Sequence, residues 1–146
     1  MDTWRTWELV LPALERRHDV LALTLPGHAG GPPLDAAVSS EAFVDAVERA
    51  IDAVGFESSH LVGNSLGGYV ALQVAARGRA TSVVAFAPAG GWAQNDQSYK
   101  ELLRGQHELY AQMKPAAPDA DALLATPAGR RRATQLITTK LRAHPA

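Results

Sequence analysis

Residues 59–68 read Ser-His-Leu-Val-Gly-Asn-Ser-Leu-Gly-Gly, and this stretch decides the fold. Its first part, Ser59–Gly63, is short and apolar on both faces, which is typical of a buried parallel strand. The residues that follow, Leu66–Arg77, have the apolar spacing of a helix. Between them lies the pattern G-x-S-x-G. A serine in this pattern, between a strand and a helix, predicts a sharp strand-to-helix turn centred on Ser65.

The residue types of this turn favour nucleophilic chemistry. A tight turn holds Ser65 in strained backbone geometry with its hydroxyl projecting outward. Glycines at positions 63 and 67 are expected to remove Cβ atoms that would collide with neighbouring elements. The backbone N–H of Leu66, at the start of the helix, is placed to stabilise an oxyanion. The competing interpretation is a purely structural glycine-rich turn.

Other segments extend this unit into an α/β arrangement. Apolar runs at Asp19–Leu25 and Thr81–Ala87 predict two further buried strands. The segment Thr3–Arg17 predicts an amphipathic helix that Pro12 kinks or restarts. Ser39 or Ser40 caps the next expected helix, which Gly55 closes and whose apolar stripe is Phe43, Val47, Ile51 and Val54. The alternation of helices and strands predicts a parallel sheet with right-handed crossovers and flanking helices.

The pattern changes after Ala87, because no further buried strand is expected. Helices are predicted at Tyr99–Met113, Asp119–Ala125 and Pro127–Ala143, with a break at Pro115–Pro118. We therefore expect a sheet-containing core over residues 1–92 and a helical, lid-like segment over residues 93–146.

Composition excludes several classes of function. The 146 residues are 47% hydrophobic and 20% charged with a net charge of −1, which favours neither nucleic acid nor an anionic membrane. No apolar run is long enough to span a bilayer, and the N-terminus lacks the features of a signal peptide. Cysteine is absent, and no pair of histidines has metal-ligand spacing beside a carboxylate. We expect a cytoplasmic protein without a cofactor or catalytic metal.

Three stretches together resemble one family. Trp4–Arg17 resembles the helix after an oxyanion strand, Asp19–His28 a strand ending in a D-x-P-G-H-G-like turn, and His60–Gly68 a nucleophile strand and elbow. Through these three stretches, residues 4–92 resemble the middle of an α/β-hydrolase of the cap-bearing esterase and C–C hydrolase type. Thr24 stands where the family commonly has Asp, a departure that concerns loop geometry.

The resemblance implies hydrolysis of small-molecule esters, thioesters or activated C–C bonds, with Ser65 as nucleophile and the Leu66 amide as one oxyanion donor. Asn64 and Trp92 are the expected substrate-binding residues. The catalytic acid and base follow the nucleophile in the family's chain order. Asp96 and His144 satisfy that order and are weak candidates for the two roles.

The resemblance also implies a partial copy that lacks both ends of the domain. The second oxyanion loop is expected upstream of Met1, and the acid and base strands downstream of Ala146. The family's strand order places one further strand between Asp19–Leu25 and Ser59–Gly63. Without that strand, we expect either that Asp19–Leu25 slides beside Ser59–Gly63 or that the fragment folds poorly. Its open sheet edges also allow pairing with another chain. The alternative function is therefore a non-catalytic, truncated or pseudoenzyme module that associates with other chains.

Overall fold

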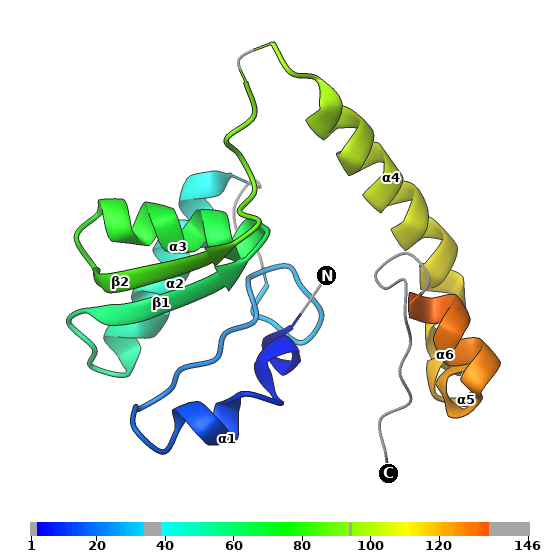
Figure 1. Cartoon of the computed structure of the whole chain (residues 1–146), viewed down its shortest axis with the longest axis horizontal. Helices are drawn as coiled ribbons and strands as arrows, with labels where there is room; N and C mark the ends of the chain where they lie inside the picture. The colour runs from blue at the N-terminus through cyan, green and yellow to red at the C-terminus, as the bar shows by residue number, and fades with distance from the viewer. Residues whose placement is uncertain (1–2, 34–38, 94, 135–146) are drawn as a thin grey trace. The chain divides into compact units, whose positions relative to one another are not determined.

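The computed structural model describes residues 3–33, 39–93 and 95–134. Two compact units are present, Met1–Gly91 and Trp92–Ala146. In the first, β1 (Ser59–Asn64) and β2 (Ala80–Phe86) form a two-stranded parallel sheet, and α3 (Leu66–Ala76) connects them (Figure 1). The predicted α/β fold with a parallel sheet and flanking helices is confirmed.

The sheet has one covered face and one bare face. The register pairs Val62 with Val84, and Asn64 with Phe86. Val62, Val84 and Phe86 are each about half exposed, at 49%, 47% and 52%. On the opposite face Gly63 is buried and its partner Ala85 is partly buried, because α3 packs there. One side of the sheet therefore carries the core, and the other presents an apolar strip to solvent.

The core lies between α3 and α2 (Ser40–Ala53). The buried side chains that form it are Phe43, Val44, Ile51, Val70 and Val74. The Oγ of Ser39 accepts a hydrogen bond from the Ala42 amide at 3.1 Å, which confirms the predicted helix start. The expected stripe was wrong at Val54, which is 47% exposed because it caps the helix outside its last turn. Val44 is buried instead.

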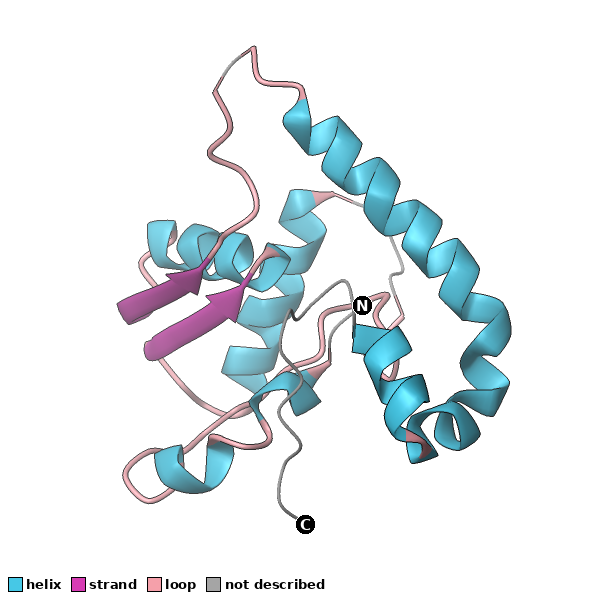
Figure 2. Cartoon of the chain, turned by 45° about the vertical axis from the view of Figure 1, so that its right-hand side comes forward, coloured by secondary structure: helices cyan, strands magenta, loops and turns pink. Residues whose placement is uncertain are grey.

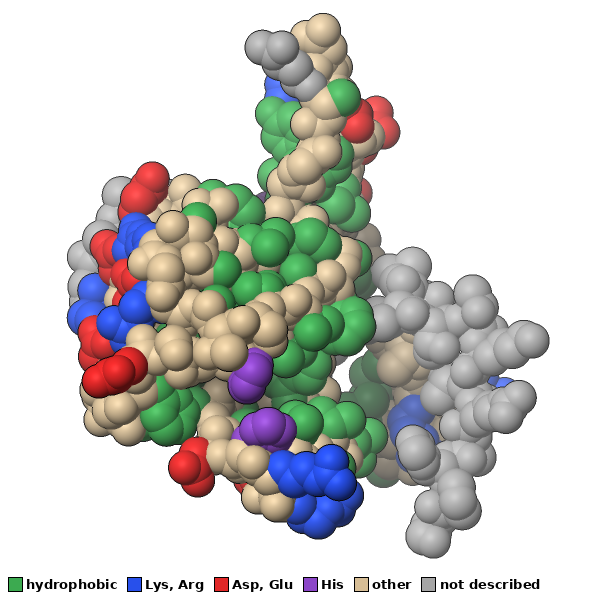
Figure 3. Space-filling view, turned by 60° about the vertical axis from the view of Figure 1, so that its left-hand side comes forward, with side chains coloured by type: hydrophobic (Ala, Val, Ile, Leu, Met, Phe, Trp, Pro, Cys, Tyr) green, Lys and Arg blue, Asp and Glu red, His purple; other side chains and the backbone are tan. Residues whose placement is uncertain are grey.

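Charged side chains join the outer surfaces of α2 and α3. The Nη1 of Arg77 lies 2.6 Å from a carboxylate oxygen of Asp45 and 2.6 Å from one of Glu48. The hydrogen bonds that Arg77 donates to these two carboxylates raise the pKa of Arg77 above its ordinary value. Arg79 pairs with Asp52 and donates to the Phe56 carbonyl oxygen at 3.1 Å. In Figure 3, acidic and basic side chains alternate along one side of the molecule, next to an apolar region.

The segment Asp19–Leu25 does not form the predicted strand. A strand needs backbone partners, and in the described part of the chain β1 pairs only with β2. The segment neither slides beside β1 nor pairs elsewhere. It is held by side chains: Thr24 Oγ1 accepts from the Trp4 amide at 3.0 Å, and Leu25 packs against the core.

The N-terminal segment is two short helical turns and not one helix. These are η1 (Trp4–Trp7) and α1 (Leu11–Leu14). Pro12 lies in the first turn of α1, where its missing N–H costs nothing. Of the two expected effects of this proline, the restart is confirmed.

In the described residues of the second unit, all regular secondary structure is helical and follows an irregular stretch before Ser98 (Figure 2). It contains α4 (Ser98–Met113), η2 (Lys114–Asp119), α5 (Ala120–Ala125) and α6 (Pro127–Thr134). The 3-10 turn η2 confirms the break expected at the prolines, and the predicted residues beyond Thr134 lie outside the described part of the chain. Within the described ranges, no helix combines the length and apolarity needed to cross a membrane. A lid function for this unit stays a prediction.

Candidate active site

Ser65 sits in the backbone conformation that the motif predicts. It follows β1 directly, it is the N-cap of α3, and its φ and ψ angles are 53° and −117°. A positive φ is uncommon outside glycine and is strained for a residue with a Cβ. Ser65 is also exposed. The predicted cramped strand-to-helix turn is therefore present, with an accessible residue at its apex.

Backbone hydrogen bonds hold Ser65 from two directions. Its N–H donates to the Phe86 carbonyl oxygen at 2.9 Å, at the end of β2. Its own carbonyl oxygen accepts from the Tyr69 amide at 3.1 Å, within α3, and from the Ala89 amide at 2.9 Å, in the loop after β2. The strained turn is thus fixed by both the helix and the neighbouring strand.

Of the two glycines expected to avoid collisions near Ser65, Gly63 does so and Gly67 does not. A Cβ on Gly63 would lie 2.2 Å from the Gly67 carbonyl oxygen, so glycine is required there. A Cβ on Gly67 would meet no atom within 4 Å beyond its own helix backbone, so the predicted collision at this position was wrong. The close approach occurs one residue later. A Cβ on Gly68 would lie 3.2 Å from the Gly63 carbonyl oxygen and from Pro88 Cα.

The amides that open α3 are the available hydrogen-bond donors beside Ser65. The first residues of a helix have no intrahelical acceptor for their N–H groups, and the helix dipole adds partial positive charge there. Leu66 is the first residue of α3 and is partly buried. The arrangement can bind a developing negative charge, and the role of Leu66 as oxyanion donor stays a prediction.

The two expected substrate-binding residues belong to different units. Asn64 ends β1, is exposed and lies beside Ser65 in the chain. Trp92 begins the second unit, where its ring lies 5.5 Å from the ring of Tyr99, centroid to centroid. Nearby on α4, Leu102 and Leu103 are more than half exposed.

The weak acid candidate, Asp96, has a local structural role. Its Oδ1 accepts a hydrogen bond from the Ser98 amide at 2.8 Å, at the start of α4. Hydrogen bonds from the backbone and then the side chain of Ser98 hold the pKa of Asp96 below its ordinary value of 3.8. These contacts account for the residue without catalysis. The base candidate, His144, lies outside the described residues.

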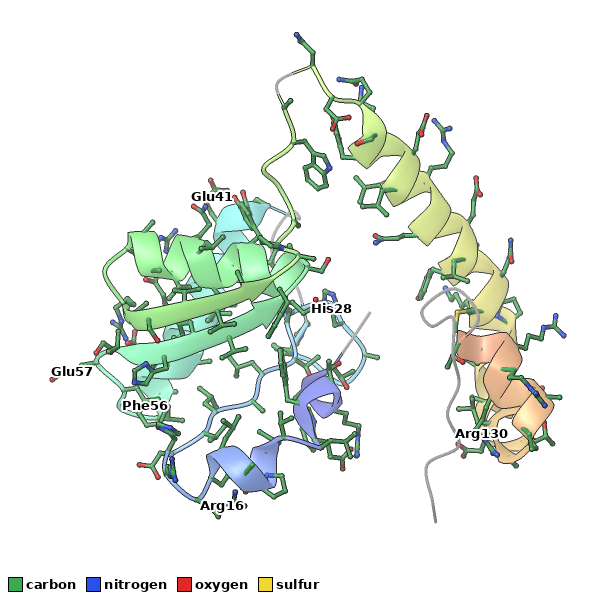
Figure 4. The ribbon with its side chains drawn as sticks, in the orientation of Figure 1. Arg16, His28, Glu41, Phe56, Glu57 and Arg130 are labelled. Carbon is green, nitrogen blue, oxygen red and sulfur yellow. The ribbon has the colours of Figure 1, made fainter. Side chains whose placement is uncertain are left out.

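The described histidines of the first unit make other contacts. His28 Nδ1 lies 3.1 Å from the Pro26 carbonyl oxygen, which stabilises the turn that carries it, toward the carboxyl ends of the strands (Figure 4). His60 Nδ1 lies 2.8 Å from Ser82 Oγ, and its ring is 6.0 Å from that of His18. In the described ranges no three His, Asp or Glu residues gather in a way that could hold a metal ion.

Comparison with known proteins assigns the family. A family model described as "Alpha/beta hydrolase family" matches residues 1–144. The chain belongs to the alpha/beta hydrolase family. This alpha/beta hydrolase is also similar to a solved variant of the meta-cleavage product hydrolase CumD. That similarity has a TM-score of 0.52 and 30% sequence identity, over 57% of this chain and 32% of the other.

Three curated relatives match parts of the chain. Epoxide hydrolase EphH of Mycobacterium tuberculosis is 56% identical over 39% of this alpha/beta hydrolase and 27% of its own length. The 2-hydroxymuconate semialdehyde hydrolase of Pseudomonas sp. CF600 is 37% identical over 51% and 26%. The acetyltransferase component of the acetoin cleaving system of Cupriavidus necator is 36% identical over 65% and 26%. The matched region thus spans about a quarter of each curated relative.

The residues at and just after the end of β2 that bond to Ser65 were not predicted from the sequence. Phe86 and Ala89 bond to Ser65 through their backbones, which any residue type supplies. Ala87 has a φ of 40°, a conformation that is not expected for an alanine. Pro88 was the one usable signal, since a proline at the end of a strand marks a turn.

Proposed function

We propose that Ser65 is the nucleophile of a hydrolase that acts on ester, thioester or activated C–C bonds. The observation that carries this proposal is the strained backbone of an exposed serine, at a φ of 53°, where a strand enters a helix. Strained residues persist only where the surrounding structure fixes them, and they cluster at active sites. A structural turn at this position would be served better by glycine.

The proposed reaction begins when Ser65 Oγ attacks the substrate carbonyl carbon. The new C–O bond forms, the hydroxyl proton passes to a general base, and the carbonyl oxygen becomes an oxyanion that the Leu66 amide stabilises. Collapse expels the alcohol, thiol or carbon leaving group, which takes up a proton, and water then releases the acyl group from Ser65. One oxyanion donor contributes about 2.7–4 kcal/mol to such a step.

The relatives favour the C–C branch of this proposal. One is named for the hydrolysis of 2-hydroxymuconate semialdehyde, and the CumD protein is titled a meta-cleavage product hydrolase. EphH is named an epoxide hydrolase, so ring opening of epoxides is an additional reaction to assay.

A fluorophosphonate probe tests the assignment of Ser65 directly. We expect the probe to label the chain at Ser65 and the Ser65→Ala variant to lose that label. Labelling should be slow, because in the described first unit no histidine hydrogen-bonds to Ser65 to act as its base. It should still be detectable, because an enzyme without a complete triad keeps roughly 10³–10⁴-fold catalysis over water from its oxyanion hole and substrate binding. The Ser82→Ala variant is the matched control, since Ser82 is also exposed and contacts a histidine. Equal labelling of wild type and Ser65→Ala would remove the basis for the proposal.

A second candidate function is a non-catalytic module that associates with other chains. The unpaired segment at residues 19–25 and the bare strip of Val62, Val84 and Phe86 favour it, because unpaired backbone and apolar surface promote association. Sedimentation should then show concentration-dependent oligomers that Phe86→Lys disrupts. Leu72→Lys is the control, because it changes an exposed leucine on α3 in the same way. Ester turnover that disappears in Ser65→Ala would argue against this candidate.

A further inference from the structure

We propose that Ala87 is a positioning residue that holds Ser65 in its strained conformation through the exit turn, defined as residues 86–89. This inference rests on the proposed role of Ser65 as nucleophile. Ser65 and Ala87 are the two non-glycine residues with a positive φ in the described part of the chain, at 53° and 40°. They belong to different strand ends, and the exit turn connects them.

The connection is a closed pair of backbone hydrogen bonds. Ser65 donates to the Phe86 carbonyl oxygen, and the Ala89 amide donates back to the Ser65 carbonyl oxygen, both at 2.9 Å. Phe86 and Ala89 are separated by two residues only. The chain must therefore turn sharply between them to present an acceptor and then a donor to the same residue, and Ala87 supplies a positive φ within that turn.

Side-chain packing fixes the other side of the exit turn. Pro88 approaches α3 so closely that a Cβ on Gly68 would lie 3.2 Å from its Cα and its Cβ. A proline biases the residue before it toward extended backbone at negative φ, so the surrounding contacts hold the positive φ of Ala87 against that preference. The turn is thus confined by Gly68 on one side and by the two hydrogen bonds to Ser65 on the other.

The energetic consequence is that two strained residues stabilise each other. A positive φ in a residue with a Cβ persists only when its surroundings over-determine it. Here Ala87 directs the groups that hold Ser65, and Ser65 provides the partners that hold the exit turn. Moving the exit turn would release the Ser65 backbone, and with it the placement of Oγ relative to the amides of α3.

Two substitutions at position 87 separate positioning from general stability. Glycine adopts a positive φ freely, so Ala87→Gly should keep both hydrogen bonds and label at Ser65 within about twofold of wild type. A β-branched side chain is a true outlier there, so Ala87→Val should slow labelling at least about tenfold. The control is Ala80→Val, the same change at the first residue of β2, which should leave labelling unchanged.

Amide hydrogen exchange tests the hydrogen bonds between Ser65 and the exit turn without depending on the reactivity of Ser65. In the wild type, the Ser65 and Ala89 amides should exchange more slowly than the Gly90 and Gly91 amides beyond the turn. Ala87→Val should speed exchange at Ser65 and Ala89 at least about tenfold, while the amide of Val74, a buried residue of α3, changes less. Rapid exchange at Ser65 in the wild type, or unchanged exchange and labelling in Ala87→Val, would overturn the inference.

The two readouts also distinguish the two proposals. Slow exchange at Ser65 and Ala89 without any probe labelling would support the role of the exit turn in holding Ser65 and would reject Ser65 as the nucleophile. Loss of labelling in Ala87→Gly with normal exchange would overturn the positioning role. If Ala87→Val does not fold, the wild-type exchange pattern and the Ala87→Gly rescue still decide the question.

Discussion

The helices of the two units differ in how many side chains they bury. In the first, α3 spans 11 residues and buries Gly68, Val70, Ala71 and Val74. In the second, α4 spans 16 residues and buries none, and over the described residues of that unit Gly129 is the buried position. The longer helix therefore depends on local sequence, whereas the shorter one is fixed by tertiary packing.

The difference in burial determines which side chains are held in a fixed position. Most helix stability in proteins comes from packing of an apolar face and not from intrinsic propensity. The conformation of Ser65 is over-determined, because a buried helix, a strand and a close glycine contact all constrain it. Side chains of α4 have no comparable constraint, so candidate roles there rest on residue type.

The largest expected effect comes from a substitution at Gly63, which lies close to the backbone of Gly67. Gly63→Ala places a Cβ 2.2 Å from the Gly67 carbonyl oxygen, so backbone must move, and we expect a loss of about 3 kcal/mol or more in the free energy of unfolding. Gly67→Ala is the matched control. Its Cβ meets open space and alanine favours helix, so stability should rise by about 0.5–1 kcal/mol. Urea denaturation compares the two, and equal stabilities would refute the packing argument.

A second substitution tests the contrast in burial between the units. Val74 is fully buried, so Val74→Ala should reduce the free energy of unfolding by about 2 kcal/mol through lost burial and a residual cavity. Leu103→Ala removes a larger side chain from α4, but that residue is 56% exposed, and the change should stay within about 0.5 kcal/mol. A similar loss for both variants would show that α4 is packed after all.

The smallest expected effect concerns the start of α4. Because hydrogen bonds from Ser98 lower the pKa of Asp96, its ionised form is favoured in the folded state. The resulting stabilisation is present above the ordinary pKa of 3.8 and is lost as the pH falls through the lower folded value. An NMR titration of the Asp96 carboxyl should therefore give a midpoint below 3.8, and a Ser98→Pro variant should return it toward that value. A midpoint at or above 3.8 in the wild type would contradict the contact.

Local pattern was sufficient for elements that find partners within the unit. The spacing around Ser65 predicted β1, α3 and the turn between them, and the cap at Ser39 predicted the start of α2. It failed for Asp19–Leu25, since an apolar run becomes a strand only when another backbone pairs with it. It also assigned to Gly67 the close contact that Gly68 makes, because residue type alone does not say which neighbour a Cβ would meet.

The candidate site was predictable only where chemistry depends on side chains. Ser65 carries a recognisable motif, but Phe86, Ala87 and Ala89 act through backbone groups that leave no mark in the sequence. Asp96 was selected for its position in the chain order, and the structure shows that a carboxylate there also serves the helix that follows.

The strip formed by Val62, Val84 and Phe86 has a practical consequence for handling the protein. Dyes that fluoresce on apolar surfaces should adsorb to it before any unfolding occurs. Melting curves recorded with such dyes would then start from a bright baseline and mask the transition. Circular dichroism follows unfolding without that interference.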